Sequence, residues 1–215
     1  RSDEHWESVQ KAFGDESAEV IPLRRRWEFE ALKIVPQEWR RELVQLIIGS
    51  HDPKQQDFAN TILPTQVFNL SITRPEIIEA THERMNGTYH TDGGGWQRGY
   101  MPRTAFVFVH HDTDKSDAEN QATAEASAQS ALGAYWTALE GTLDPTKVAK
   151  ASDNALVGNP ETVAAQIVER FHPEDRLMLW FDFFNHDNDA VKRSMKVFME
   201  EVAPRVEKLL KDKAS

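Results

Sequence analysis

The sequence lacks several features on which protein function is often built. It contains no cysteine, which excludes a disulfide framework, a thiolate zinc site, an iron–sulfur cluster and a cysteine nucleophile. Its longest apolar runs, such as 105–109 and 177–181, are far shorter than the ~20 residues that span a bilayer. A G-x-S-x-G elbow, a P-loop and a G-x-G-x-x-G fingerprint are also missing. The sequence therefore gives no sign of an α/β-hydrolase elbow, a P-loop or a Rossmann dinucleotide site.

Positive charge is also scarce. The chain has 25 Lys and Arg against 35 Asp and Glu, a net charge of −10. Nucleic-acid binders need a basic face to neutralise phosphates, so we expect no nucleic-acid partner. The first five residues, RSDEH, are unlike a signal peptide. We therefore expect a cytoplasmic protein without a membrane partner, and a small molecule as its substrate.

Four short segments have the composition of buried β-strands. They are rich in β-branched and aromatic residues and apolar nearly throughout, which is typical of parallel strands covered on both faces. The predicted strands are Leu43–Ile48, Gln66–Ile72, Thr104–His110 and Arg176–Phe184. The 215 residues provide one ordinary domain, in which residues 1–42 form a poorly defined N-terminal segment.

Helical patterns alternate with these strands. We predict helices over Pro53–Thr61, Pro75–Asn86, Ser116–Glu140, Pro160–Phe171 and Ala190–Leu210. Strands separated by such long crossovers run parallel, which indicates an α/β fold. Asp52 and Asn159 are placed to cap helices that begin with proline. Pro204 falls inside the last helical pattern and predicts a kink or break near Ala203.

Ligands of parallel α/β folds bind at the carboxyl ends of the strands. There, Gly49 and Ser50 lead into a helix whose free N–H groups favour an anion. Asp52 opposes a phosphate unless it serves as the cap, and a plain capped turn is the alternative interpretation. Arg74 fits a phosphate or carboxylate clamp or, equally, an ordinary surface position. At the opposite strand ends, Thr65, Arg103 and Asp175 have the character of surface residues.

Histidines and aspartates near the last two strands raise a second hypothesis. His110, Asp182 and His186 are candidate ligands of a metal-dependent hydrolase, although their spacing is poor and polar loop residues are the simpler interpretation. Asp182 lies between two phenylalanines, where a buried carboxylate requires a partner or a function. No metal ligand is assigned from the sequence.

Three segments together resemble a known family. They are Ala155–Ala164 (ALVGNPETVA), the predicted strand Arg176–Phe184, and Val197–Val206 (VFMEEVAPRV). Their order and spacing resemble the C-terminal signature of luciferase-like flavin-dependent monooxygenases, in which VG-x-PE-x-VA opens the helix before the last strand. The segment Ile47–Asn60 also resembles the strand–Ser–helix element of that family. The resemblance covers roughly residues 40–210.

The resemblance implies a TIM (β/α)8 barrel of the bacterial luciferase-like type. The four predicted strands would be strands five to eight, so only the C-terminal half of the barrel would be present. Such a barrel needs ~250 residues, and the chain begins without methionine. We therefore expect a C-terminal fragment of a longer chain. The catalytic residues are unknown, because they would lie in the missing half, and we expect the fragment to be inactive alone.

The resemblance also implies a cofactor and its contacts. Reduced FMN and O2 would oxygenate a small organic substrate, with a flavin reductase as electron donor and a homodimer as assembly. Gly49, Ser50 and His51 would hold the phosphate, Asn69 and Ser71 would line the ring or substrate pocket, and Arg74 would reach an anionic group. A deazaflavin-dependent hydride transfer is the close alternative. A non-catalytic half-barrel module that assembles with another chain is the third alternative, because open strand edges need a partner.

Overall fold

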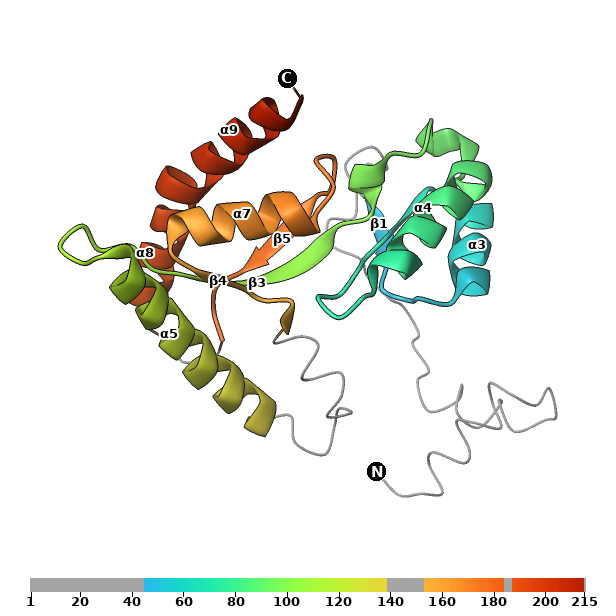
Figure 1. Cartoon of the computed structure of the whole chain (residues 1–215). Coiled ribbons are helices and arrows are strands. Elements are labelled where there is room, and N and C mark those ends of the chain that lie inside the picture. The colour runs from blue at the N-terminus through green and yellow to red at the C-terminus, as the bar shows by residue number, and fades with distance from the viewer. Residues whose placement is uncertain (1–44, 139–152, 184–186, 215) are drawn as a thin grey trace, which may run out of the picture. The chain divides into compact units, whose positions relative to one another are not determined.

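A computed structural model describes residues 45–138, 153–183 and 187–214 (Figure 1). The chain divides into two units, Arg1–Val44 and Gln45–Ser215, and every described residue belongs to the second. The start of the first predicted strand, His186 of the metal hypothesis and the N-terminal segment 1–42 lie outside the described residues.

Parallel strands form the centre of the described unit. Strand β1 (Leu46–Ile48) pairs with β2 (Thr65–Val67). Strand β3 (Arg103–Val109) pairs with β4 (Leu156–Gly158) and with β5 (Leu177–Trp180). A single parallel bridge between Asn69 and Arg103 connects β2 to β3. The expected α/β fold with parallel strands is confirmed.

Several strands are shorter than their sequence patterns predicted. The second ends at Val67 instead of Ile72, because the chain turns and the Thr73 N–H donates to the Leu70 carbonyl. The fourth ends at Trp180 instead of Phe184. Strand β4 was missed, because its three residues directly precede a strong helix signal and were interpreted as part of that signal.

The helices lie close to their predicted positions. They are α3 (Pro53–Ile62), α4 (Pro75–Thr88), α5 (Asp117–Ala138), α7 (Pro160–Arg170), α8 (Asn188–Val197) and α9 (Ala203–Ala214), with short 3-10 turns η2 (Thr91–Gly93) and η3 (Arg98–Tyr100). The two predicted caps are confirmed: the Asp52 side chain accepts from the Lys54 N–H, and that of Asn159 accepts from the Thr162 N–H.

Pro204 perturbs the last helix where it was expected to. A π-helical turn, η4 (Phe198–Val202), joins α8 to α9, and the Ala203 N–H donates to the Phe198 carbonyl five residues earlier. Proline lacks an N–H and its ring crowds the carbonyl four residues before it. The wider turn makes room for that ring while the helix continues.

The core is built around β3, whose residues Thr104–Val109 are all buried. Its alternate side chains face opposite layers, as the pleat requires. Ala105, Val107 and Val109 pack with residues of α7 and η4, whereas Phe106 and Phe108 pack against α5. Figure 1 shows α7 and α9 on one side of β3 and α5 on the other. Burial on both faces is thus confirmed for β3.

The outer strands differ from the expectation of full coverage. In β1, Leu46 and Ile47 are exposed, and in β5 Met178 and Trp180 are exposed while their neighbours are half-buried. An apolar face that remains open to solvent loses the roughly 1.5–3 kcal/mol that burying each such side chain contributes. The described residues therefore leave an apolar strand surface uncovered.

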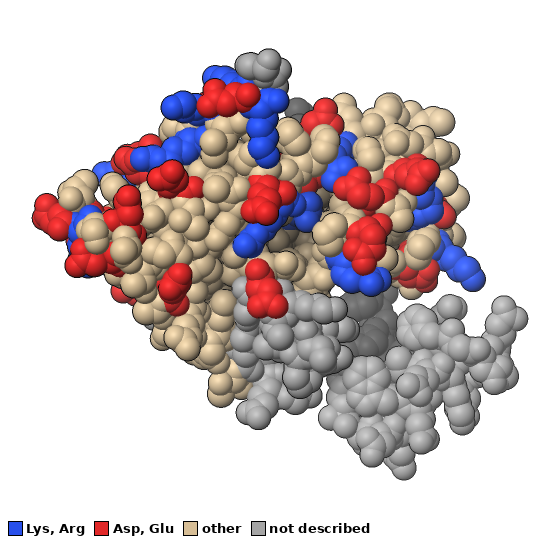
Figure 2. All heavy atoms as spheres, in the orientation of Figure 1, with Lys and Arg blue, Asp and Glu red and all other residues tan. Residues whose placement is uncertain are grey.

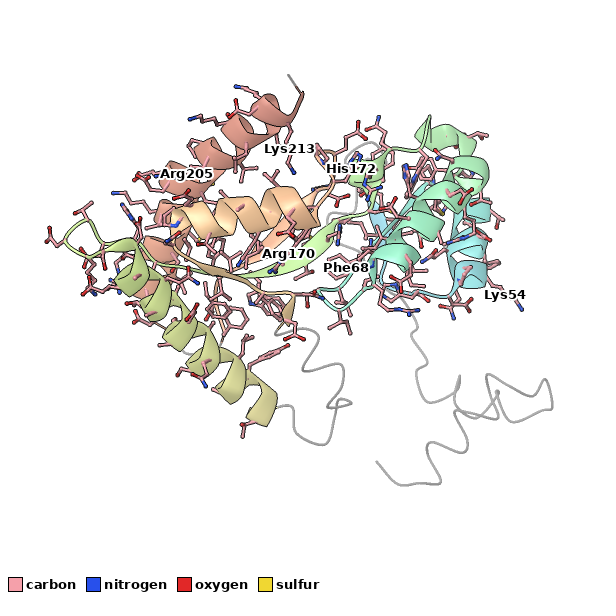
Figure 3. All side chains as sticks on the ribbon, viewed as in Figure 1. Lys54, Phe68, Arg170, His172, Arg205 and Lys213 are labelled. Atoms are coloured by element: carbon pink, nitrogen blue, oxygen red, sulfur yellow. The ribbon has the colours of Figure 1, made fainter. Side chains whose placement is uncertain are left out.

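The GNPE segment has a clear structural role. Gly158 has φ of +149°, and a Cβ there would lie 2.9 Å from Thr162 Cβ and would also meet Gln121 Oε1. The same Gln121 oxygen accepts from the Asn159 N–H at 3.1 Å. Only glycine fits this approach. Arg170, the last residue of α7 and labelled in Figure 3, donates to the carbonyl of Ala155, the residue that precedes β4.

Candidate functional site

The loops that follow β1 and β2 lie beside each other. Ile48 is in register with Val67, so Gly49, Ser50 and His51 continue from the same level as Asn69. A contact of 3.3 Å between His51 Nε2 and Thr73 Oγ1 joins the two loops. The structure therefore brings four of the six predicted cofactor-binding residues to one edge of the strand pair.

Hydrogen bonds fix the first of these loops. The Asp52 N–H donates to Ser50 Oγ at 3.2 Å, and the Ser50 carbonyl accepts from Gln56 Nε2 at 2.7 Å. Gln56 is 1% exposed and also bonds to Arg84. Gln56 is thus a positioning residue that the sequence did not reveal, because a glutamine inside a helix carries no motif.

The helix end at this loop already holds a negative group. Asp52 Oδ1 accepts from the Lys54 N–H at 3.0 Å, and Pro53 has no N–H to offer. The Gln55 and Gln56 N–H groups are bonded to the Asp52 carbonyl. The N-terminus of α3 is therefore capped by its own carboxylate, as the capped-turn interpretation predicted, and it gives a phosphate little to bind. Gly49 faces open space.

Asn69 is the unusual member of the group. Its backbone N–H donates to the Pro102 carbonyl and its carbonyl accepts from the Thr104 N–H. Its side chain is 0% exposed, yet neither Oδ1 nor Nδ2 has a hydrogen-bond partner among the described residues. Burying an amide without partners costs about 1–3 kcal/mol in proteins. Such a group is a candidate for contact with a ligand that carries both a donor and an acceptor.

The remaining two predicted residues have local roles. Ser71 lies in the turn after β2, where its carbonyl accepts from Asn154 Nδ2 at 2.8 Å. Arg74 occupies the N-cap position of α4 and forms an exposed ion pair of 3.0 Å with Glu76. Exposed pairs are worth little energetically, so Arg74 retains the freedom to bind an anion, and its role stays a prediction.

The amino ends of β3 and β5, level with Asn69, carry an ion cluster where surface residues were predicted. The side chain of Asp175 is 1% exposed and accepts hydrogen bonds from Arg98 Nε and Arg103 Nη1, each at 2.6 Å. Arg98 also pairs with Glu79 at 2.5 Å, which lowers the pKa of Glu79 through this hydrogen bond. The prediction for Arg103 and Asp175 was wrong, as it was for buried Thr65. Charges of opposite sign from distant segments satisfy one another here, and no local pattern reveals that.

A cavity of about 440 Å3 lies at the other end of β3. Phe108 and His110 from β3, Ser127 from α5 and Arg193 from α8 line it, together with Phe183. His110 Nε2 is shielded from solvent and has no hydrogen-bond partner among the described residues. Burial lowers the pKa of the His110 imidazole below its usual range, with a further contribution from nearby Lys115.

The metal hypothesis gains no support from the described part of the chain. Within it, no three His, Asp or Glu side chains come together as a metal site would require. Asp182 lies beyond the end of β5 and is exposed, so the expectation of a carboxylate in an apolar strand was wrong. Within the same ranges, no helix has the length and hydrophobicity needed to cross a membrane.

Comparison with known proteins gives a likeness at the level of fold. No family model and no curated protein matches the sequence. Among solved structures, the monooxygenase RslO1 from Streptomyces bottropensis matches with a TM-score of 0.58 at 19% identity, over 94% of this chain and 60% of that one. Apo-MsnO8 matches with a TM-score of 0.47 at 14% identity, over 93% and 64%.

The chain therefore spans about 60% of the length of the monooxygenase whose fold it shares. At this identity the likeness shows the fold alone. It agrees with the sequence-based resemblance as far as fold is concerned, and the activity is a matter of inference.

Proposed function

We propose that this chain is part of a flavin-dependent monooxygenase that oxygenates a small organic molecule. The fold shared with a monooxygenase supports this assignment. The observation that carries it is the Asn69 amide, which is fully buried without a hydrogen-bond partner among the described residues. It lies at the strand end where the resemblance places the ring or substrate pocket. Reduced FMN would supply the electrons for activating O2.

The residues present fit the ring of a flavin better than its phosphate. A flavin ring edge carries both hydrogen-bond donors and acceptors, and Asn69 offers one unsatisfied group of each kind. Ser50 and His51 lie on the adjoining loop, and Gly49 permits close approach of a ligand. The capped end of α3 disfavours the phosphate there, so Arg74 is the better candidate for that group.

In this proposal the protein binds and orients the cofactor. Asn69 fixes the ring edge, because an amide held by the strand backbone on both sides has little freedom to move. Gln56 holds the Ser50 carbonyl and so keeps the neighbouring loop in one conformation. The same contacts would accept a deazaflavin, which has a similar ring edge, and the choice between these cofactors is part of the test.

The test is a comparison of cofactor binding by two asparagine variants. The full chain is titrated with oxidised FMN, reduced FMN and a deazaflavin. We expect saturable binding of one of them, with Asn69→Leu weakening it at least about tenfold because a ring donor or acceptor then loses its partner. The control is Asn86→Leu in α4, an exposed position, which should bind as the parent does. Equal binding by both variants, or no binding of any cofactor, refutes the proposal.

A further inference from the structure

The cavity at the carboxyl end of β3 is separate from the candidate cofactor loops. Asn69 is level with Arg103 at the start of β3, and His110 follows the last residue of that strand. At about 3.3 Å per residue, the seven steps from Arg103 to His110 place the two levels roughly 23 Å apart. The function proposed for Asn69 therefore leaves this cavity unexplained.

The cavity has the dimensions and walls of a small-molecule site. Its volume of about 440 Å3 lies within the range of about 300–1,000 Å3 typical of such sites. Phe108, Phe181 and Phe183 line it. Phe108 and Phe183 stack with ring centroids 4.5 Å apart, and Phe106 meets Phe183 edge-on at 5.1 Å. This rigid aromatic wall favours a planar, apolar ligand.

One polar atom of the wall lacks a partner. His110 Nε2 is buried without a hydrogen bond among the described residues. Burial keeps this imidazole in its neutral form, since the pKa of His110 is lowered. With the ring proton on Nδ1, the neutral imidazole leaves Nε2 able to accept a hydrogen bond from a hydroxyl group. A ligand that reaches this atom therefore gains most when it presents an O–H.

Charged side chains of both signs line the cavity. Two carboxylates line the cavity, but Glu200 pairs with Lys196 at 3.9 Å and Glu201 pairs with Arg205 at 2.6 Å. Arg193 lines the same rim and is exposed. Figure 2 shows that the surface over the C-terminal part of α5 carries few charged side chains, in contrast to that over α9. The lining residues carry two positive and two negative charges, so the aromatic wall and His110 determine what the cavity favours.

We infer that this cavity binds a planar aromatic molecule that bears a hydroxyl group, with the rings against Phe108 and Phe183 and the hydroxyl on His110 Nε2. Arg193 lines the same cavity and adds a positive charge to its wall. The site is independent of the flavin and would exist in the chain without it.

The test uses two probes that differ in one hydrogen-bond donor. Equilibrium binding of 2-naphthol and of 2-methoxynaphthalene to the full chain is measured without flavin. We expect saturable binding of 2-naphthol and at least about tenfold weaker binding of the methyl ether, because only the naphthol can donate to Nε2. This comparison needs no variant, so it does not depend on the folding of a mutant.

A pair of histidine variants locates the effect. His110→Leu should remove the preference for 2-naphthol, while His90→Leu, whose ring accepts a local hydrogen bond from the Asp92 N–H, should retain it. The inference is overturned if 2-naphthol does not bind, if both probes bind equally, or if His110→Leu keeps the preference. Flavin binding is measured in parallel, so a failure of the proposed cofactor site is recognised separately.

Discussion

Replacing Asn69 with leucine should leave the free protein about as stable as the parent chain or more stable, whereas the same change at Asn60 should destabilise it strongly. Both asparagines are buried, at 0% and 3% exposure. Asn60 bonds through Nδ2 to the Gln56 and Thr65 carbonyls and through Oδ1 to the Thr65 N–H, each at 3.1 Å. The Asn69 amide has no partner among the described residues.

The magnitudes follow from this difference. Asn60→Leu removes the bonds to a buried N–H and carbonyl of Thr65, at about 1–3 kcal/mol for each group left unpaired, so a loss of roughly 3 kcal/mol is expected. Asn69→Leu removes an unpaired amide that costs about 1–3 kcal/mol. The bulkier leucine offsets part of that gain through a packing cost of about 1–3 kcal/mol. The net change at Asn69 should therefore stay within about 1 kcal/mol of zero or favour the folded state.

Urea unfolding monitored by tryptophan fluorescence measures both changes, with the midpoint and the slope reported separately. The reasoning fails if Asn69→Leu lowers the free energy of unfolding as much as Asn60→Leu does. That result would mean that the folded chain already satisfies the Asn69 amide and that no ligand is needed to explain it.

Three further predictions concern the ion cluster, the glycine turn and the cavity histidine. Asp175→Asn should lower the free energy of unfolding in urea by about 3–5 kcal/mol, because it leaves two arginines without their shared carboxylate. The control Asp189→Asn, in an exposed pair, should change that free energy by less than about 0.5 kcal/mol. Equal effects of the two substitutions would contradict the account. Gly158→Ala should clearly lower the midpoint of thermal unfolding, because the added Cβ would clash with Gln121 and Thr162 and because the backbone there has a positive φ. An unchanged midpoint would contradict this reasoning. The lowered pKa of His110 means that the unfolded chain binds the proton more readily, so stability should fall as pH drops from about 7 through the unfolded pKa near 6.5. His110→Leu should reduce that fall, and an identical pH profile of the variant would contradict the assignment.

Local signals determined how much of this fold was predictable. Helix starts such as Asp52-Pro53 and Asn159-Pro160 combine a cap with a proline, and β3 combines length with hydrophobicity, so both appear in the sequence. Strand β4 was missed because its pairing with β3 depends on residues about fifty positions away. The length of β2 was overestimated because the turn at Leu70 carries no glycine or proline.

The candidate site was predictable in part, for a related reason. The strand-end rule and the family resemblance together selected Gly49, Ser50, His51 and Asn69, which the structure brings together. It could not reveal that Asn69 would be buried without partners, since this depends on packing from several elements. Likewise, Asp175 and Arg103 lie more than seventy positions apart, so only the folded chain shows that their charges are paired.

The most direct test of the central claim is to observe the Asn69 side-chain amide while reduced FMN is added. In the 15N-labelled full chain, the Asn69 NH2 resonances, assigned with Asn69→Leu, should shift saturably as the flavin binds. The amide resonances of Asn60, whose partners are within the protein, should move far less. Asn69 resonances that stay unchanged at saturating reduced FMN and deazaflavin would contradict the account.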